Sequence, residues 1–181
     1  MPLDKSSKKK LLDIARQTIV SVLSHQKMPS LNVKEPELLE KRGVFVTLKK
    51  GEDLRGCIGC LKSEWPLYWA VQEMASSSAF RDPRFKPVTR AELDDLTIEI
   101  SVLSPLKSIR HASEIILGEH GILIQKGDRS GCFLPQVAQE TGWSLEEFLG
   151  HCARDKAGLG WDDWREADIF VFAAEVFSES H

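Results

Sequence analysis

Apolar residues repeat along this chain with both the helical and the strand period, so the sequence predicts a mixed fold. Residues 97–103 form the clearest strand pattern, in which aliphatic side chains alternate with polar ones that include Glu99 and Ser101. Apolar residues at helical spacing occupy the N-terminal segment and the stretches 64–78 and 145–157. We therefore expect helices at these three places and a strand at 97–103.

Two hairpins and one long apolar run complete the predicted sheet. Alternating residues on both sides of a polar, glycine-bearing turn predict a hairpin over 43–60, and a second hairpin covers 121–134. Residues 168–176 are apolar on both faces, which indicates a single, fully buried strand. These elements predict an α+β fold, a mostly antiparallel sheet flanked by helices. A length of 181 residues fits one domain spanning 1–181.

The segment Leu54–Cys60, which follows the first turn, carries the most distinctive chemistry. As a regular strand it places Arg55 and Cys57 on one face, and a thiol beside a guanidinium has a lowered pKa. Gly56 and Gly59 offer no side chain to pack, which is typical of a place where another backbone or a ligand comes close. The alternative interpretation is a strand with a bulge and a buried cysteine.

Glu99 lies on the polar face of its predicted strand, where a carboxylate needs either water or a partner. If this strand and the strand of Arg55 lie in one sheet, with their aliphatic faces toward the same core, both charged side chains emerge on the same side. We therefore expect a bidentate ion pair between Arg55 and Glu99.

The cysteines and histidines do not form a recognisable metal motif. Cys57 and Cys60 are spaced C-x-x-C, but Cys132 and Cys152 stand alone in the sequence, so we expect no metal site. Cys60 should point away from Cys57, and Cys152 should be a core residue on the apolar face of a helix. His120, in a glycine-flanked turn, is left with three interpretations: a general base, a metal ligand, or a turn residue bonded to its own backbone.

Composition narrows the class of protein without indicating a reaction. A net charge of −3 argues against a nucleic-acid binder. No apolar run approaches the ~20 residues of a membrane helix, and no signal segment opens the chain, so we expect a cytoplasmic protein with reduced cysteines. The dinucleotide fingerprint and the phosphate-binding glycine loop are both absent from the sequence, and we expect no cofactor.

The segment Leu54–Gly59 resembles the signature of the AMMECR domain family, whose bacterial and archaeal members are called AmmeMemoRadiSam system protein A. Further segments match that family in the same order, namely Phe80–Phe85, Glu99–Leu103, Gly118–Gly121 and Leu134–Val137. The resemblance implies a larger and a smaller subdomain with a cleft between them. We expect the smaller subdomain to be centred on 118–160.

The same resemblance bears on the site and on partners. It implies that the proline-containing loop 80–87 is a wall of the site, with Asp82 or Arg84 facing inward, and it strengthens the interpretation of His120 as a site residue. The system name implies shared work with a MEMO-like protein and a radical-SAM enzyme. This chain lacks the three-cysteine motif of a radical-SAM cluster, so that cluster would belong to the partner.

Two hypotheses of different classes follow. In the first, the protein is an enzyme in which Cys57 is a thiolate nucleophile or an acyl or alkyl acceptor. Arg55 would stabilise the thiolate or an anionic substrate, Glu99 would orient Arg55, and His120 would transfer protons. Substrate-binding residues would be Gly56, Gly59, Ser101, Asp82 and Arg84.

In the second hypothesis the protein is a non-catalytic module. The same cleft would bind a peptide or small molecule for a MEMO-like protein or a radical-SAM enzyme. A lowered Cys57 pKa and a covalent adduct would favour the enzyme. An unreactive thiol together with partner binding would favour the module.

Overall fold

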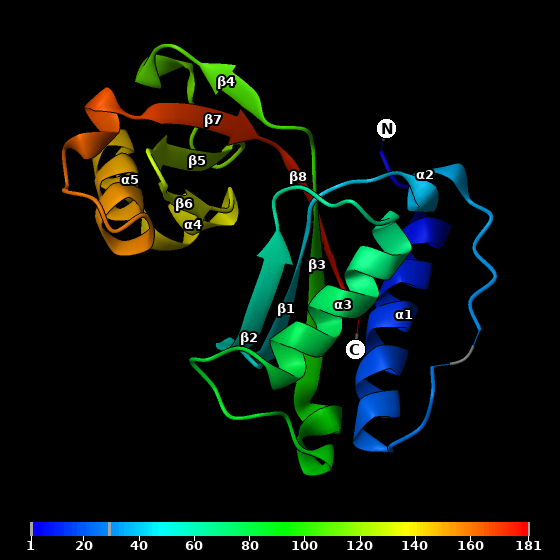
Figure 1. The fold of residues 1–181 in the computed structure, drawn as a ribbon. Coiled ribbons are helices and arrows are strands. Elements are labelled where there is room, and N and C mark those ends of the chain that lie inside the picture. Colours follow the sequence, from blue (N-terminus) through cyan, green and yellow to red (C-terminus); the bar gives the residue numbers. More distant parts are fainter. Residues whose placement is uncertain (1, 29, 181) are drawn as a thin grey trace. The chain divides into compact units, whose positions relative to one another are not determined.

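The computed structural model describes residues 2–28 and 30–180, which divide into two compact units (Figure 1). The first unit, unit 1, contains the residues up to Leu103 together with those from Glu175 onward, and unit 2 is Ser104–Ala174. Unit 2 is therefore inserted between strands β3 (Leu96–Leu103) and β8 (Ala174–Ser178), which are neighbours in the sheet of unit 1. Each unit has its own cluster of buried apolar residues.

Unit 1 is a four-stranded sheet with helices on one face. Strands β1 (Val44–Lys50) and β2 (Asp53–Cys60) form the predicted first hairpin, and the strand order is β2-β1-β3-β8. Helices α1 (Lys5–Leu23) and α3 (Leu67–Phe80) lie side by side along this sheet (Figure 1). The aliphatic side chains of alternate strand residues pack beneath the helices and are fully buried, namely Val44, Val46, Leu48, Ile98, Ile100 and Val102.

Unit 2 contains a second four-stranded sheet in the order β4-β7-β5-β6. Its strands are β4 (Lys107–Ile109), β5 (Gly121–Lys126), β6 (Arg129–Phe133) and β7 (Asp168–Phe172). Strands β5 and β6 are the predicted second hairpin. The α-helices are α4 (Gln136–Thr141) and α5 (Leu145–His151), and α5 continues as a π-helical turn, η3 (Cys152–Lys156). Cys152 is completely buried in this core, where the sequence pattern placed it.

The remaining elements are short. In unit 1 they are α2 (Pro36–Leu39) and the 3-10 helix η1 (Arg90–Asp95), and in unit 2 they are the 3-10 helices η2 (Ala112–Glu114) and η4 (Asp163–Glu166). The α+β class is confirmed, with two antiparallel sheets.

The prediction of a single buried strand over 168–176 is wrong. The run contains β7 and the start of β8, which belong to different sheets. The chain leaves the ladder at Ala173, whose backbone carbonyl accepts from the Ser104 N–H and whose N–H donates to the Ser104 hydroxyl. The apolar residues run on from β7 through Ala173 and Ala174 to Val176, so the pattern did not show the change of sheet.

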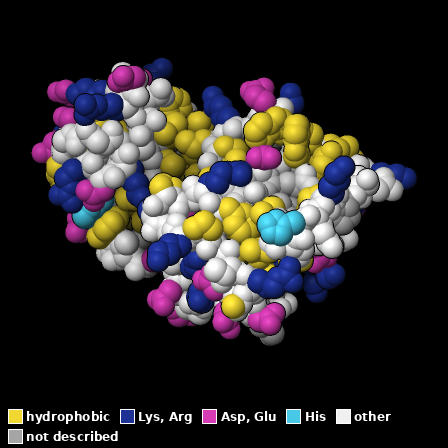
Figure 2. Space-filling view, turned by 60° about the horizontal axis from the view of Figure 1, so that its bottom comes forward, with side chains coloured by type: hydrophobic (Ala, Val, Ile, Leu, Met, Phe, Trp, Pro, Cys, Tyr) yellow, Lys and Arg dark blue, Asp and Glu magenta, His cyan; other side chains and the backbone are white. Residues whose placement is uncertain are grey.

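On the face of the molecule shown in Figure 2, neither positive nor negative charge dominates. Basic and acidic side chains are interspersed there, with hydrophobic side chains between them. Among the exposed large apolar residues are Trp65 and Trp69, whose ring centroids lie 5.2 Å apart. Within residues 2–28 and 30–180, no helix has both the length and the apolar character needed to cross a membrane.

Candidate functional site

The candidate site lies on the sheet face of unit 1 that is opposite to α1 and α3. Cys57 on β2, Thr47 on β1 and Glu99 on β3 are direct cross-strand neighbours and form one row across this face. Gly59, Phe45 and Ser101 form the next row. The structure therefore brings the predicted residues Cys57, Glu99 and Ser101 to one face, because aliphatic side chains of the same strands are needed on the other.

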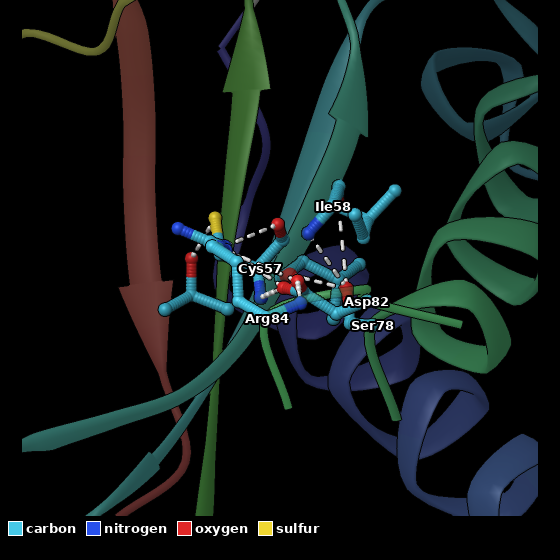
Figure 3. A network of polar contacts seen from close by, with 7 residues as sticks. Cys57, Ile58, Ser78, Asp82 and Arg84 are labelled. Carbon is cyan, nitrogen blue, oxygen red and sulfur yellow. Dashed lines mark hydrogen bonds and ion pairs between the residues drawn. The ribbon is translucent and has the colours of Figure 1, made fainter. Parts of the chain in front are cut away.

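The backbone of Cys57 is held by two side chains from the loop after α3. β2 is an edge strand, so the N–H and C=O groups of Cys57 that point outward have no neighbouring strand. Asp82 Oδ2 accepts from the Cys57 N–H at 3.0 Å, and Arg84 Nη2 donates to the Cys57 carbonyl at 3.2 Å. Figure 3 shows these side chains gathered around the backbone of Cys57 and Ile58.

Asp82 and Arg84 also bind each other. Arg84 Nε donates to Oδ1 at 3.0 Å and Nη2 to Oδ2 at 2.8 Å, which is a bidentate pair, and the Arg84 backbone N–H donates to Oδ1. The Asp82 side chain is 1% exposed, whereas that of Arg84 is 49% exposed. These hydrogen bonds, the Arg84 guanidinium first, lower the pKa of Asp82 to about 2. A buried carboxylate thus fixes the direction of a half-exposed guanidinium.

Ser78, near the end of α3, supports the next residue of β2. Its hydroxyl donates to the Val46 carbonyl at 2.7 Å and accepts from the Ile58 N–H at 2.9 Å. Val46 and Ile58 face each other across β1 and β2, so the hydroxyl bridges the two strands (Figure 3). The α3 end and the loop after it therefore hold the Cys57–Ile58 segment from two directions.

The Cys57 thiol is partly buried and bonded to a neighbour. Its sulfur lies 3.3 Å from Thr47 Oγ1. Burial raises the pKa of the Cys57 thiol above its ordinary value, despite the Thr47 hydrogen bond and the charge of Arg84, both of which lower it. The direction is opposite to the one expected from a neighbouring Arg55, and the charges that act on this thiol are those of Arg84, Asp82 and Glu99.

The predicted Arg55–Glu99 ion pair is wrong. Arg55 donates from Nε and Nη2 to the two carboxylate oxygens of Glu92, in η1, at 2.8 and 3.2 Å. Glu99 instead pairs with Lys49, at 3.3 Å. The reason is a β-bulge: the register of β1 and β2 shifts between Leu48 and Lys49, and Arg55 is the residue without a partner on β1. The bulge breaks the alternation that would have put Arg55 beside Cys57.

The two predicted substrate-binding glycines have neighbours within the protein. A Cβ on Gly56 would collide with the carbonyl oxygen of Ser78, and one on Gly59 would collide with the ring of Phe45. The expected close approach of another backbone is therefore present at Gly56, whereas the neighbour of Gly59 is a side chain of β1, neither a backbone nor a ligand.

The structure gives His120 and Cys60 surroundings of their own. His120 belongs to unit 2, and its Nδ1 accepts from the Ile116 N–H at 3.0 Å within its own turn, as in the last of its three interpretations. Cys60 pairs with Val44 and packs against the core of unit 1, on the sheet face opposite to Cys57, as predicted. Across the part of the chain that the structure describes, no group of three or more metal-ligating side chains is present.

Three members of the cluster were not predicted: Thr47, Ser78 and Glu92. Regular pairing counted back from the hairpin turn would place Val46 opposite Cys57, and only the bulge brings Thr47 there, so Thr47 could not be found by counting. Glu92 stands three residues after Thr89, and this capping box, which the structure contains, was visible in the sequence. Ser78 had no signal, because its role depends on how α3 approaches the sheet.

Comparison with known proteins finds one matching family model and several similar chains. The family model described as AMMECR1 matches residues 12–177. Protein MK0488 of Methanopyrus kandleri is 44% identical over 180 residues, which cover 93% of this chain and 86% of that protein. A protein of Aquifex aeolicus is 40% identical over 161 residues, covering 81% of this chain and 82% of its own.

A solved structure is also similar. The crystal structure of the uncharacterised protein PH0010 from Pyrococcus horikoshii matches with a TM-score of 0.89 and 39% sequence identity. The match covers 95% of this chain and 91% of that chain.

Proposed function

This chain belongs to the AMMECR1 family, and we propose that it is a binding module whose recognition group is the Arg84 guanidinium beside Cys57. One observation carries the proposal: the buried Asp82 holds Arg84 bidentately, while the Arg84 side chain stays half exposed. A guanidinium fixed in this way loses little conformational entropy when it binds a planar or tetrahedral anion. Its occupant is therefore an acidic group on a partner or on a small molecule.

The state of Cys57 favours binding over covalent catalysis. A thiolate, not a thiol, is the nucleophile, and a raised pKa leaves Cys57 protonated at neutral pH. Cys57 then contributes a small, weakly polar surface and a backbone that positions Arg84. Asp82 is a positioning residue, since its oxygens are used by Arg84 and by the Cys57 N–H.

The family resemblance supplies the partners to test: a MEMO-like protein and a radical-SAM enzyme, with a peptide or a small molecule as the further possibility for the site. Arg84→Ala should weaken binding of whichever partner uses the site, whereas Cys57→Ser should retain it. Arg81→Ala is the matched control, because Arg81 is an exposed arginine of the same loop that contacts Ser77 and Glu73 instead.

The decisive measurement is the pH dependence of Cys57 alkylation, followed by peptide mass spectrometry. We expect the iodoacetamide reaction at Cys57 to rise with a midpoint above pH 9.0, the ordinary value from which burial raises the thiol pKa. A midpoint near neutrality, together with a Cys57 adduct in the intact mass after incubation with cell extract, would overturn the binding role and favour the nucleophile.

A further inference from the structure

Arg84 and Arg55 are held in the same way, each by its own carboxylate. In both side chains Nε and Nη2 donate to the two oxygens of one carboxylate, Asp82 for Arg84 and Glu92 for Arg55. The pKa of Glu92, like that of Asp82, is lowered to about 2, chiefly by the hydrogen bonds from its arginine. Both guanidinium groups are therefore oriented before any ligand arrives.

In both arginines, Nη1 is the guanidinium nitrogen that the carboxylate does not bind. Nη1 of Arg55 is buried and has no hydrogen-bond partner. Nη1 of Arg84 also lacks a hydrogen-bond partner within residues 2–28 and 30–180. In Arg55 this leaves a buried charged donor unpaired, which is unfavourable and favours an acceptor from outside the chain, whereas Arg84 is half exposed.

Both arginines meet at one aromatic ring. The Cζ atom of Arg84 lies 5.4 Å from the ring centroid of Phe85, and that of Arg55 lies 6.0 Å from it. Lys50 adds a third cation, 3.4 Å from Glu92. The three cations of this ion-pair network, Arg55, Arg84 and Lys50, thus exceed its two carboxylates, Asp82 and Glu92, by one charge.

We propose that this cluster binds a phosphate dianion, as the free ion or as the monoester of a small molecule, beside Phe85. A phosphate presents several strong acceptor oxygens in a tetrahedral arrangement, so it suits two separate guanidinium donors, one on β2 and one in the loop after α3. A carboxylate has one charge and two oxygens in one plane, which suits a single guanidinium fork. This inference rests on the proposed binding role of Arg84 and names the ligand class.

The test is calorimetric titration with inorganic phosphate and with phenyl phosphate, at constant ionic strength set by chloride. We expect both wild-type protein and the control Arg81→Lys to bind with equal affinity, and Arg84→Lys and Arg55→Lys to lose at least about tenfold, the effect of one charge-assisted hydrogen bond. Binding of inorganic phosphate alone would identify the free ion, and equal or tighter binding of phenyl phosphate would identify a monoester. Acetate should not compete.

A second measurement uses the unaltered protein, in case a variant fails to fold. Phosphate should shift the backbone amide signals of Phe85 and its neighbours in a nitrogen–proton correlation spectrum. Absence of any phosphate effect, equal binding by both lysine variants, or shifts confined to unit 2 would overturn the inference. If partner binding still depends on Arg84 in that case, the proposed function stands and only the phosphate assignment fails.

Discussion

Asp82 decides, at the scale of single residues, how the edge of β2 is completed. An edge strand presents N–H and C=O groups that pair with foreign strands unless something covers them. Asp82 accepts from the Cys57 N–H and orients Arg84, which donates to the Cys57 carbonyl. Two side chains thus act in place of a neighbouring strand at this residue, and the same contacts fix the proposed recognition group.

Asp82→Asn should destabilise the fold in a pH-dependent way. The pKa of Asp82 is about 2 in the folded protein, against 3.8 as its ordinary value, so its contribution is present above about pH 4 and is lost as the pH falls toward 2. With Arg84 half exposed, the contribution is about 1–2 kcal/mol. Urea unfolding of both proteins at pH 7 and near pH 2 measures it.

Comparing wild type with Asp82→Asn also separates the contribution of Asp82 to the unfolding free energy from that of Glu92. The pKa of Glu92 is likewise lowered to about 2, so the wild-type protein loses both contributions over the same pH range. The difference between wild type and Asp82→Asn isolates Asp82. A difference that stays constant between pH 7 and pH 2 would contradict the ion-pair explanation.

At the scale of elements, the contact between β2 and the end of α3 positions the site. Gly56 is buried where the Ser78 carbonyl approaches the strand, and the Ser78 hydroxyl bridges Val46 and Ile58. Because the backbone of a packed helix cannot move aside cheaply, this close approach requires glycine at position 56.

Gly56→Ala should therefore cost about 1–3 kcal/mol of unfolding free energy, the usual range for overpacking. It should also lower hydrogen-exchange protection of the Ile58 amide, since the added methyl group displaces Ser78 from its bridge. The control is Gly51→Ala, whose φ of 61° makes alanine strained but whose surroundings are open. The control should lose stability through backbone strain while leaving protection at Ile58 unchanged. Equal loss of protection in both variants would show that the helix contact is not responsible.

The bulge at Arg55 shows where prediction of elements from sequence ends. Alternation was sufficient to place the hairpin over 43–60 and to put Cys57 and Glu99 on one face, because the aliphatic residues must face the core. A bulge adds one residue to one strand and leaves the apolar pattern of its partner unchanged. The pairing of Arg55 with Glu92 depends on that extra residue and on η1, so spacing could not indicate it.

At the scale of the whole molecule, the chain is one unit interrupted by another. The α+β class followed from the mixture of periods, but the insertion did not, since no turn signal separates β7 from β8 in the sequence. Where the chain returns to unit 1, it adds β8 beside β3 and brings Glu179 against Arg16 of α1. The last strand of unit 1, β8, thus follows the whole of unit 2 in the sequence.

Glu179, which follows β8, binds to both α1 and β3. Its carboxylate accepts from Arg16 Nε at 2.9 Å and from the Ile98 N–H at 2.9 Å. Arg16 also donates to the carbonyls of Leu93 and Leu96, at 2.8 and 2.7 Å. The side chains of Arg16 and Glu179 are 26% and 19% exposed, so the pair is only partly screened by water. One ion pair therefore joins α1, the start of β3 and the C-terminal segment.

Glu179→Gln should loosen unit 1 and leave unit 2 unchanged. The amide keeps one oxygen, which can still accept from the Ile98 N–H and from Arg16 Nη2, but its NH₂ group cannot accept from Arg16 Nε, so we expect a cost of about 1–3 kcal/mol. Because each unit has its own core, hydrogen exchange read by mass spectrometry should show faster exchange in α1, β3 and β8, with β5 and β7 unaffected. Asp13→Asn, which breaks the exposed pair with Lys9, is the control and should cost about 0–1 kcal/mol. Faster exchange spread equally over both units would instead mean that Glu179 supports the stability of the whole chain, and unit 2 would then depend on the closure of unit 1.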